Sequence, residues 1–163
     1  GYLTDHYDPR SKVVRLSTDI YNGDSIASVS VAAHECGHAV QDKEGYFFLK
    51  FRSFLVPIVN FSSKFGYLAV LIGLIFGAMN LAWIGIFLLV AILLFQLITL
   101  PVEFNASKRG KMFLNKLKVV DQSEKSMASS MLMAAAMTYV ASLISTLLEL
   151  LRLVLIVMGN DRD

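Results

Sequence analysis

A run of 38 residues without a charged side chain, residues 65–102, constrains this chain more than any other feature. Lys64 precedes the run, and Glu103 follows it directly. A helix that crosses a bilayer needs about 20 apolar residues, so the run is too long for one straight span and just long enough for two. The sequence therefore predicts a transmembrane helical hairpin over 65–102, with its turn near Met79-Asn80-Leu81.

Two further patterns concern the membrane segments. Ala69, Gly73 and Gly77 recur every four residues, which predicts a stripe of small side chains where two helices approach closely. A second uncharged stretch covers 127–148 and predicts a third, C-terminal transmembrane helix over 127–158. The alternative is a soluble protein with a buried hairpin, which would require an 18.1 kDa domain to cover three apolar segments.

Composition and charge placement favour the membrane interpretation. Hydrophobic residues make up 55% of the chain and charged residues 17%, against about 45–50% and about 25% in soluble domains. The net charge of +2 is too small to indicate a nucleic-acid partner. Lys and Arg are absent between Lys64 and Lys108 and flank the hairpin on both sides. Because basic loops stay on the cytoplasmic side, 1–64 and the basic segment 103–126 are predicted to share that side of the cytoplasmic membrane.

The part before the hairpin reads as a short strand followed by a helix. Residues 12–21 are rich in β-branched and aromatic side chains and predict one strand. Asp24 or Ser25 is expected to cap a helix that ends at about Asp42. Residues 46–61 suit either a segment at the membrane interface or a buried amphipathic helix. With 163 residues, we expect a single domain over 1–163.

The motif that carries chemistry lies in residues 31–41, VAAHECGHAVQ, which match H-E-x-x-H. On a helix, His34 and His38 share a face, and their neutral imidazoles can bind one zinc ion. Glu35 follows the first histidine and can act as general base toward a zinc-bound water. Cys36 should face away from the ion, and we interpret it as a small core residue. The alternative is two ordinary core histidines.

Two histidines leave a catalytic zinc site incomplete, because such sites have three protein ligands and an open position. Glu103 is the predicted third ligand, since the hairpin would return it to the side of the His34 helix. His6 and several carboxylates are further candidates for this ligand. The alternative for Glu103 is an ordinary charge near a helix N-terminus beside Pro101, favoured by the helix dipole.

Three motifs together resemble a known family. LTDHYDP (3–9), SIASVSVAAHECGHAVQ (25–41) and LPVEFNAS (100–107) are similar to bacterial membrane zinc metallopeptidases of the YugP type. The resemblance covers essentially the whole chain, including TYVASL at 138–143. Members of that family carry additional N-terminal sequence with a membrane anchor, so the resemblance implies further sequence before Gly1.

More distantly, the chain is similar to gluzincins such as the HtpX-type and CAAX prenyl proteases. In those proteins a Glu on a later helix is the third zinc ligand, and an Asp four residues on supports a ligand histidine. Glu103 matches the first position, but Ser107 stands at the second. Asn105 or Ser107 is therefore expected to hydrogen-bond a ligand imidazole. The implied fold is mainly α and integral to the membrane, with a zincin-like HExxH helix preceded by a short strand.

The predicted function is a membrane-embedded zinc-dependent endopeptidase with one Zn²⁺ per chain. His34, His38 and Glu103 would hold the metal, and Glu35 would be the general base toward zinc-activated water. Its partners would be a peptide or protein substrate and membrane lipid. An additional donor toward the scissile carbonyl is expected, and the candidates are His6, Tyr7 and Tyr139. His6 is the preferred one.

Two competing hypotheses share these segments. One is a non-catalytic membrane scaffold or transport component whose zinc site is structural or regulatory. The other is a zinc peptidase that requires the missing N-terminal part for activity. A structural zinc site is usually closed by four protein ligands, which separates the first hypothesis from a peptidase.

Overall fold

The computed structural model describes residues 4–161, which divide into two compact units. The first unit comprises residues 4–50 and 100–138, and the second comprises residues 51–99 and 139–161. Three long helices contribute residues to both units: α3 (Phe47–Ile75), α4 (Met79–Lys116) and α5 (Glu124–Asn160). The single domain over 1–163 stays a prediction.

The first unit begins with a two-stranded antiparallel sheet. Strand β1 (His6–Asp8) pairs with β2 (Val13–Arg15), and Tyr7 lies opposite Val14. The tight connection between the strands includes Lys12 with a positive φ of 55°. The sequence did not predict β1, because three residues are too few to display a periodic pattern.

The predicted strand over 12–21 is right for β2 and wrong for its second half, where α1 (Thr18–Tyr21) forms instead. Ser17 lies between the two elements. Its backbone N–H donates to Asp5 Oδ1 over 2.6 Å, and its hydroxyl lies 3.3 Å from the other oxygen of that carboxylate. Because Asp5 occupies the Ser17 N–H, the strand ladder ends and the chain turns into the short helix.

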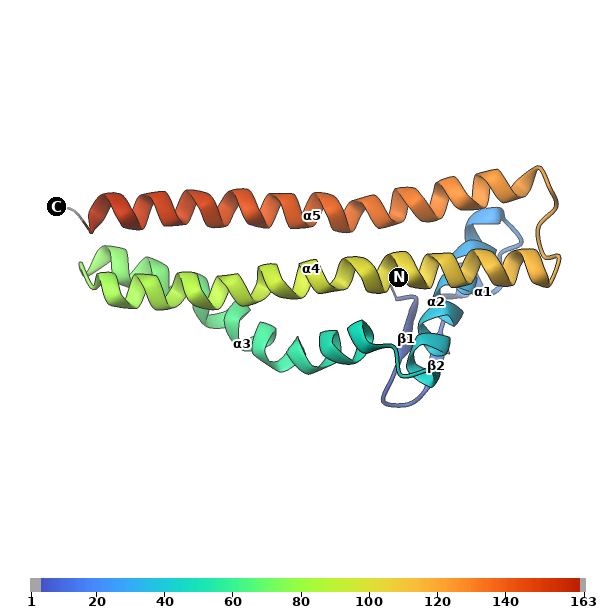
Figure 1. Cartoon of the computed structure of the whole chain (residues 1–163), viewed down its shortest axis with the longest axis horizontal. Coiled ribbons are helices and arrows are strands. Elements are labelled where there is room, and N and C mark those ends of the chain that lie inside the picture. Colours follow the sequence, from blue (N-terminus) through green and yellow to red (C-terminus); the bar gives the residue numbers. More distant parts are fainter. Residues whose placement is uncertain (1–3, 162–163) are drawn as a thin grey trace. The chain divides into compact units, whose positions relative to one another are not determined.

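Helix α2 (Ile26–Lys43) matches the predicted helix closely. It begins after Ser25, whose side chain accepts a hydrogen bond from the Ser28 backbone N–H over 3.1 Å. This is the usual N-cap arrangement, and it satisfies one of the free N–H groups at the helix start. Helix α2 lies beside both strands (Figure 1).

The core of the first unit joins α2 to α4 and α5. Ala33 from α2 packs with Leu114 from α4, with Val120 from the loop after α4, and with Ala128 from α5. All four side chains are buried. This core holds α2 against the C-terminal half of α4, and both helices carry predicted site residues.

The second unit contains the predicted hairpin. Helix α3 (Phe47–Ile75) covers residues 47–61 of the segment 46–61 without a break, with Pro57 inside it, and continues into the hairpin. The turn lies at residues 76–78, slightly before the predicted position. The reason is Gly77, which takes the left-handed conformation with φ of 65° and lets Met79 begin α4.

Small residues bring the two arms of the hairpin together. A Cβ on Gly73 would lie 2.5 Å from the backbone nitrogen of Ala82, and a Cβ on Gly85 would lie 2.7 Å from the carbonyl oxygen of Gly66. The predicted stripe is therefore right for Gly73, whereas Gly77 makes the turn.

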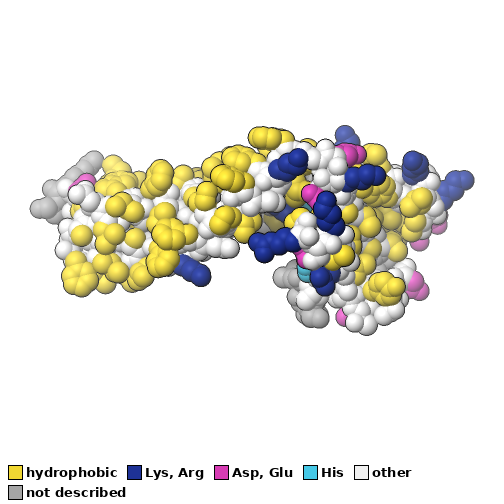
Figure 2. Space-filling view, turned by 90° about the horizontal axis from the view of Figure 1, so that it is seen from below, with side chains coloured by type: hydrophobic (Ala, Val, Ile, Leu, Met, Phe, Trp, Pro, Cys, Tyr) yellow, Lys and Arg dark blue, Asp and Glu magenta, His cyan; other side chains and the backbone are white. Residues whose placement is uncertain are grey.

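Three helices of the described residues, α3, α4 and α5, are long and apolar enough to cross a membrane, judged by length and composition. Large hydrophobic side chains are exposed along all three of them. On the face shown in Figure 2, hydrophobic side chains cover much of the second unit, and most Lys and Arg side chains belong to the first. The predicted third apolar helix is present as part of α5.

Candidate metal centre

The candidate centre lies where α2 passes α4 in the first unit. Gly37 of the HExxH segment meets Ala106, and a Cβ on Gly37 would lie 2.4 Å from the Ala106 carbonyl oxygen. One turn further along, a Cβ on Gly110 would lie 3.0 Å from the Ala33 carbonyl oxygen. The two backbones approach this closely only because these positions lack side chains. The short distance allows a carboxylate on α4 to reach the imidazoles on α2.

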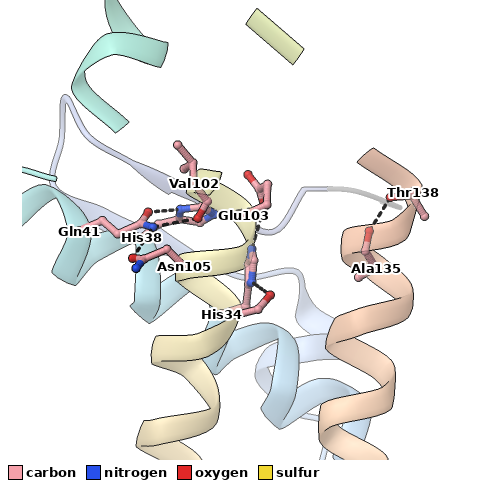
Figure 3. A network of polar contacts seen from close by, with 9 residues as sticks. His34, His38, Gln41, Val102, Glu103, Asn105, Ala135 and Thr138 are labelled. Carbon is pink, nitrogen blue, oxygen red and sulfur yellow. Dashed lines mark hydrogen bonds and ion pairs between the residues drawn. The ribbon is translucent and has the colours of Figure 1, made fainter. Parts of the chain in front are cut away.

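Three side chains meet at this crossing. His34 Nε2 lies 3.0 Å from Glu103 Oε2, and His38 Nε2 lies 3.6 Å from the same oxygen. The candidate ligand atoms all lie within 4.8 Å of one another. Figure 3 shows the His34 ring pointing from α2 toward Glu103 on α4. The structure therefore brings together the three residues that the sequence predicted as ligands.

The spacing of these atoms fits one zinc ion. Zinc binds imidazole nitrogen and carboxylate oxygen at about 2.0–2.2 Å with tetrahedral geometry, so its ligand atoms lie ~3.3 Å apart. The two measured separations, 3.0 and 3.6 Å, bracket that value. The imidazole rings are perpendicular to each other, with centroids 4.7 Å apart, which leaves both Nε2 atoms facing the carboxylate. Two nitrogens and one carboxylate oxygen are a common donor set for zinc.

The centre is largely closed to solvent. Glu103 is 4% exposed and His38 is 7% exposed. A carboxylate and two imidazoles are costly to bury unless they have partners, and here they contact one another. The arrangement is thus a polar cluster inside the first unit, of the kind that coordination of a metal would satisfy.

Glu35 lies next to the cluster on α2 and is 9% exposed. Within residues 4–161, no hydrogen bond or ion pair holds its carboxylate. Its carboxylate oxygens keep contact with solvent, since the fully buried, unpaired side-chain atoms of the described residues belong to Ser30, Ser62 and Gln96. Its lone pairs are available to accept a proton.

Ser107 and Asn105, the predicted supports of the imidazoles, occupy different places. Ser107 Oγ lies 3.0 Å from His34 Nδ1, and Ser107 is buried. Asn105 Oδ1 instead accepts hydrogen bonds from Gln41 and Arg109, over 3.0 and 2.7 Å. Ser107, four residues after Glu103, thus contacts the imidazole of His34, whereas Asn105 hydrogen-bonds to neither histidine of the cluster.

Gln41 is the site residue that the sequence analysis missed. It is fully buried, and its Oε1 lies 2.9 Å from His38 Nδ1. Its Nε2 donates to the Val102 carbonyl oxygen over 2.8 Å and to Asn105 Oδ1 over 3.0 Å (Figure 3). The available signal was the spacing, because a polar residue three positions after His38 shares its helical face.

The three residues predicted as hydrogen-bond donors to the scissile carbonyl of a substrate lie outside the cluster of His34, His38 and Glu103. His6 is exposed on β1, and its Nδ1 lies 2.7 Å from the Thr4 carbonyl oxygen. The Tyr7 hydroxyl donates to Asp42 Oδ2 over 2.7 Å, and burial together with this bond raises the pKa of Tyr7 to about 12. Tyr139 belongs to the second unit and is 41% exposed.

Cys36 lies outside the cluster, as expected, but the prediction that it is a core residue is wrong. Its side chain is exposed. It lines an apolar groove of about 520 Å³, whose other walls come from α2, the end of α4 and the following loop. The Cys36 face of α2 therefore lines a groove and does not pack against a neighbouring element of the described residues. The α2 sequence contains no pattern that predicts this exposure.

Comparisons with known proteins extend over the whole chain. A profile of the family described as "Putative neutral zinc metallopeptidase" matches residues 1–158. The chain is 48% identical over 163 residues to the "Putative membrane protease YugP" of Bacillus subtilis (strain 168), an alignment that covers 100% of this chain and 72% of that protein. No solved structure matches the chain. The matched range includes the cluster on α2 and α4.

Proposed function

Because the chain belongs to the family described as "Putative neutral zinc metallopeptidase", we propose that it is a membrane-embedded zinc-dependent endopeptidase. One observation carries the proposal: His34, His38 and Glu103 offer three ligand atoms at one point. Among the described residues, no fourth ligand joins this group. Three protein ligands are typical of catalytic zinc sites, whereas structural sites are closed by four. This difference favours a peptidase over a scaffold with a structural zinc.

The three ligands would each have a defined part. His34 and His38 would bind one Zn²⁺ through Nε2, and Glu103 would bind it through a carboxylate oxygen. When bound, zinc would supply Lewis acidity, which lowers the pKa of a coordinated water toward ~7 and polarises a carbonyl group. Ser107 would hold the His34 ring in the orientation needed for binding.

Glu35 would carry out the proton transfers. Glu35 directly follows His34 on α2, and within residues 4–161 no hydrogen bond or ion pair holds its carboxylate, so it would accept a proton from the attacking water. It would then pass that proton to the leaving amine as the peptide bond breaks. His6 is the first candidate for the hydrogen-bond donor to the substrate carbonyl. Tyr7 and Tyr139 are the alternatives, and Tyr7 stays neutral at physiological pH because its pKa is about 12.

We infer the location of the protein from the distribution of its Lys and Arg residues and from the name of its relative. Lys and Arg are absent from 65–107 and flank that segment on both sides, so we infer a multi-pass protein of the cytoplasmic membrane with its basic segments in the cytoplasm. The metal ligands lie in or directly beside these segments and would share that side. The curated relative is named a membrane protease, which supports a peptide or protein as substrate.

The proposal is tested by Glu35→Gln. The amide keeps the size of the side chain but cannot accept the water proton, so peptide hydrolysis should fall by about 10²–10⁴-fold. Zinc content should stay at one ion per chain, measured by elemental analysis of protein purified in detergent. Glu149→Gln makes the same chemical change at an α5 residue that pairs with Arg152, and it should leave both quantities unchanged.

Three results would contradict the proposal. If Glu35→Gln hydrolyses a peptide library as fast as the wild type, Glu35 is not the base. If the purified wild type binds zinc through four protein ligands in X-ray absorption, the site is structural. Hydrolysis lost together with zinc in Glu35→Gln would make Glu35 a ligand and would refute its separate role as the base.

A further inference from the structure

Gln41 lies between the candidate metal cluster and the rest of the first unit, and none of its amide atoms is exposed. We propose that Gln41 is a positioning residue that fixes the tautomer of His38, so that the lone pair of Nε2 faces the metal. The inference rests on the proposed zinc site but not on peptidase activity. The inference is derived from a series of hydrogen bonds. The series starts at groups that can only donate or can only accept, and each of them fixes the direction of the next hydrogen bond.

The first fixed point is the carbonyl of Val102. A backbone carbonyl oxygen can only accept hydrogen bonds, and it lies 2.8 Å from the side-chain amide of Gln41. The Gln41 atom at that place must therefore be the NH₂ group. This settles the orientation of an amide whose oxygen and nitrogen have nearly the same shape.

The second fixed point is Arg109, whose guanidinium can only donate. Its Nε lies 2.7 Å from Asn105, so the Asn105 atom there is the carbonyl oxygen. The same oxygen lies 3.0 Å from Gln41 and needs a donor from it. Arg109 is itself held by Glu44, with 2.7 Å between Nη2 and Oε2. The two fixed points agree, and both direct the Gln41 NH₂ group away from His38.

The Gln41 oxygen is then the atom that faces His38. It lies 2.9 Å from Nδ1 and can only accept, so Nδ1 must carry a hydrogen. A neutral imidazole has one N–H, so Nε2 of His38 keeps its lone pair. Nε2 lies 3.6 Å from Glu103 Oε2, longer than an ordinary N–H···O hydrogen bond of about 2.7–3.2 Å. The ring is thus set with its ligand atom toward the cluster before any ion arrives.

His34 provides the contrast. Its Nδ1 contacts the hydroxyl of Ser107, which can donate or accept. Its Nε2 lies 3.0 Å from Glu103 Oε2, within hydrogen-bonding distance. Ser107 can therefore serve either tautomer by rotating its hydroxyl, whereas the fixed amide of Gln41 serves only one. Gln41 therefore restricts His38 to one tautomer, whereas Ser107 allows both tautomers of His34.

The primary test is the tautomer of His38 in the metal-free wild-type chain. The chain has only three histidines, so two-bond ¹H–¹⁵N spectra of ¹⁵N-histidine protein in detergent can be assigned with His6→Gln and His34→Gln. In its neutral imidazole form, His38 should show a proton on Nδ1 only. A proton on Nε2 in the wild type would overturn the inference without any variant.

The second test uses Gln41→Met, which keeps the length of the side chain but removes both polar atoms. His38 should become a mixture of tautomers, and zinc affinity, measured by chelator competition, should fall about 10–100-fold. The matched control is Ser107→Ala, which removes the partner of His34 and should leave the His38 signals unchanged. An unchanged His38 tautomer in Gln41→Met would refute the role of Gln41. A wild type that binds zinc but lacks peptidase activity would end the proposed function and leave this inference standing.

Discussion

The close passage of α2 over α4 makes Gly37→Ala the sharpest test of the metal centre. The added Cβ would lie 2.4 Å from the Ala106 carbonyl oxygen, while an ordinary C···O contact is about 3.3 Å. The neighbour is backbone and cannot rotate away, so the helices must separate by roughly 0.9 Å. The ligands are divided between these helices, with the histidines on α2 and Glu103 on α4.

The separation should affect zinc far more than folding. Metal–ligand distances tolerate only about ±0.2 Å, so binding would require the crowded contact to be compressed again. Overpacking of this kind costs about 1–3 kcal/mol, which corresponds to a loss of zinc affinity of roughly 5–150-fold. The free energy of unfolding of the metal-free protein should change less, because replacing Gly by Ala stabilises the helix by about 0.5–1 kcal/mol and offsets part of the cost of overpacking.

The assay is chelator competition for zinc affinity together with thermal unfolding of the metal-free protein in detergent. Gly110→Ala, where the Cβ would meet Ala33 at 3.0 Å, should give a smaller loss of affinity. Gly159→Ala, where no atom of the described residues lies within 4 Å, should leave zinc affinity unchanged. Wild-type zinc affinity in Gly37→Ala would refute the argument that this crossing sets the distance between the ligands.

Two further predictions concern Glu103 and Tyr7. Glu103→Ala removes the carboxylate between the imidazoles and should weaken zinc binding by more than the roughly 10–100-fold typical of residues that only support a ligand. Unchanged zinc stoichiometry and affinity in titrations would return Glu103 to the role of an ordinary helix charge. The pKa of Tyr7 is raised from 10.0 to about 12 by burial and by its bond to Asp42. The neutral phenol therefore adds stability that is fully present below pH 10 and is lost as the pH rises through about 12. Circular dichroism at increasing pH should show this loss in the wild type and not in Tyr7→Phe, and identical profiles would contradict it.

The candidate site could be predicted in part because half of it is local. His34 and His38 are four residues apart, so helix geometry alone puts them on one face. Glu103 lies 65 residues beyond His38 in the sequence, and it was identified from the position of a charge after an apolar run and from the family resemblance. Gln41 was missed because its role depends on the Val102 carbonyl and on Asn105, and backbone contacts between helices leave no pattern in the sequence.

The secondary structure was likewise predictable only where the sequence signal is local. Long apolar or well-capped segments, such as α2 and the hairpin, were predictable because each carries its signal over many residues. The short elements were not, since β1 and α1 contain three and four residues. The end of β2 depends on Asp5, which takes the N–H of Ser17 from twelve residues away. That contact exists only after the chain has folded back.

By itself, the sequence determined that the chain has three helices apolar enough for a membrane and one helix with two imidazoles on the same face. These properties follow from hydrophobic length and helical period, which are local. Only the tertiary structure decided that Glu103 meets both histidines, that Gly37 touches Ala106, and that Gln41 faces Nδ1 of His38. The first two depend on the distance between α2 and α4, and the third depends on the Val102 carbonyl and Asn105 of α4, which orient the Gln41 amide. Such distances are set by backbone packing between segments far apart in the chain.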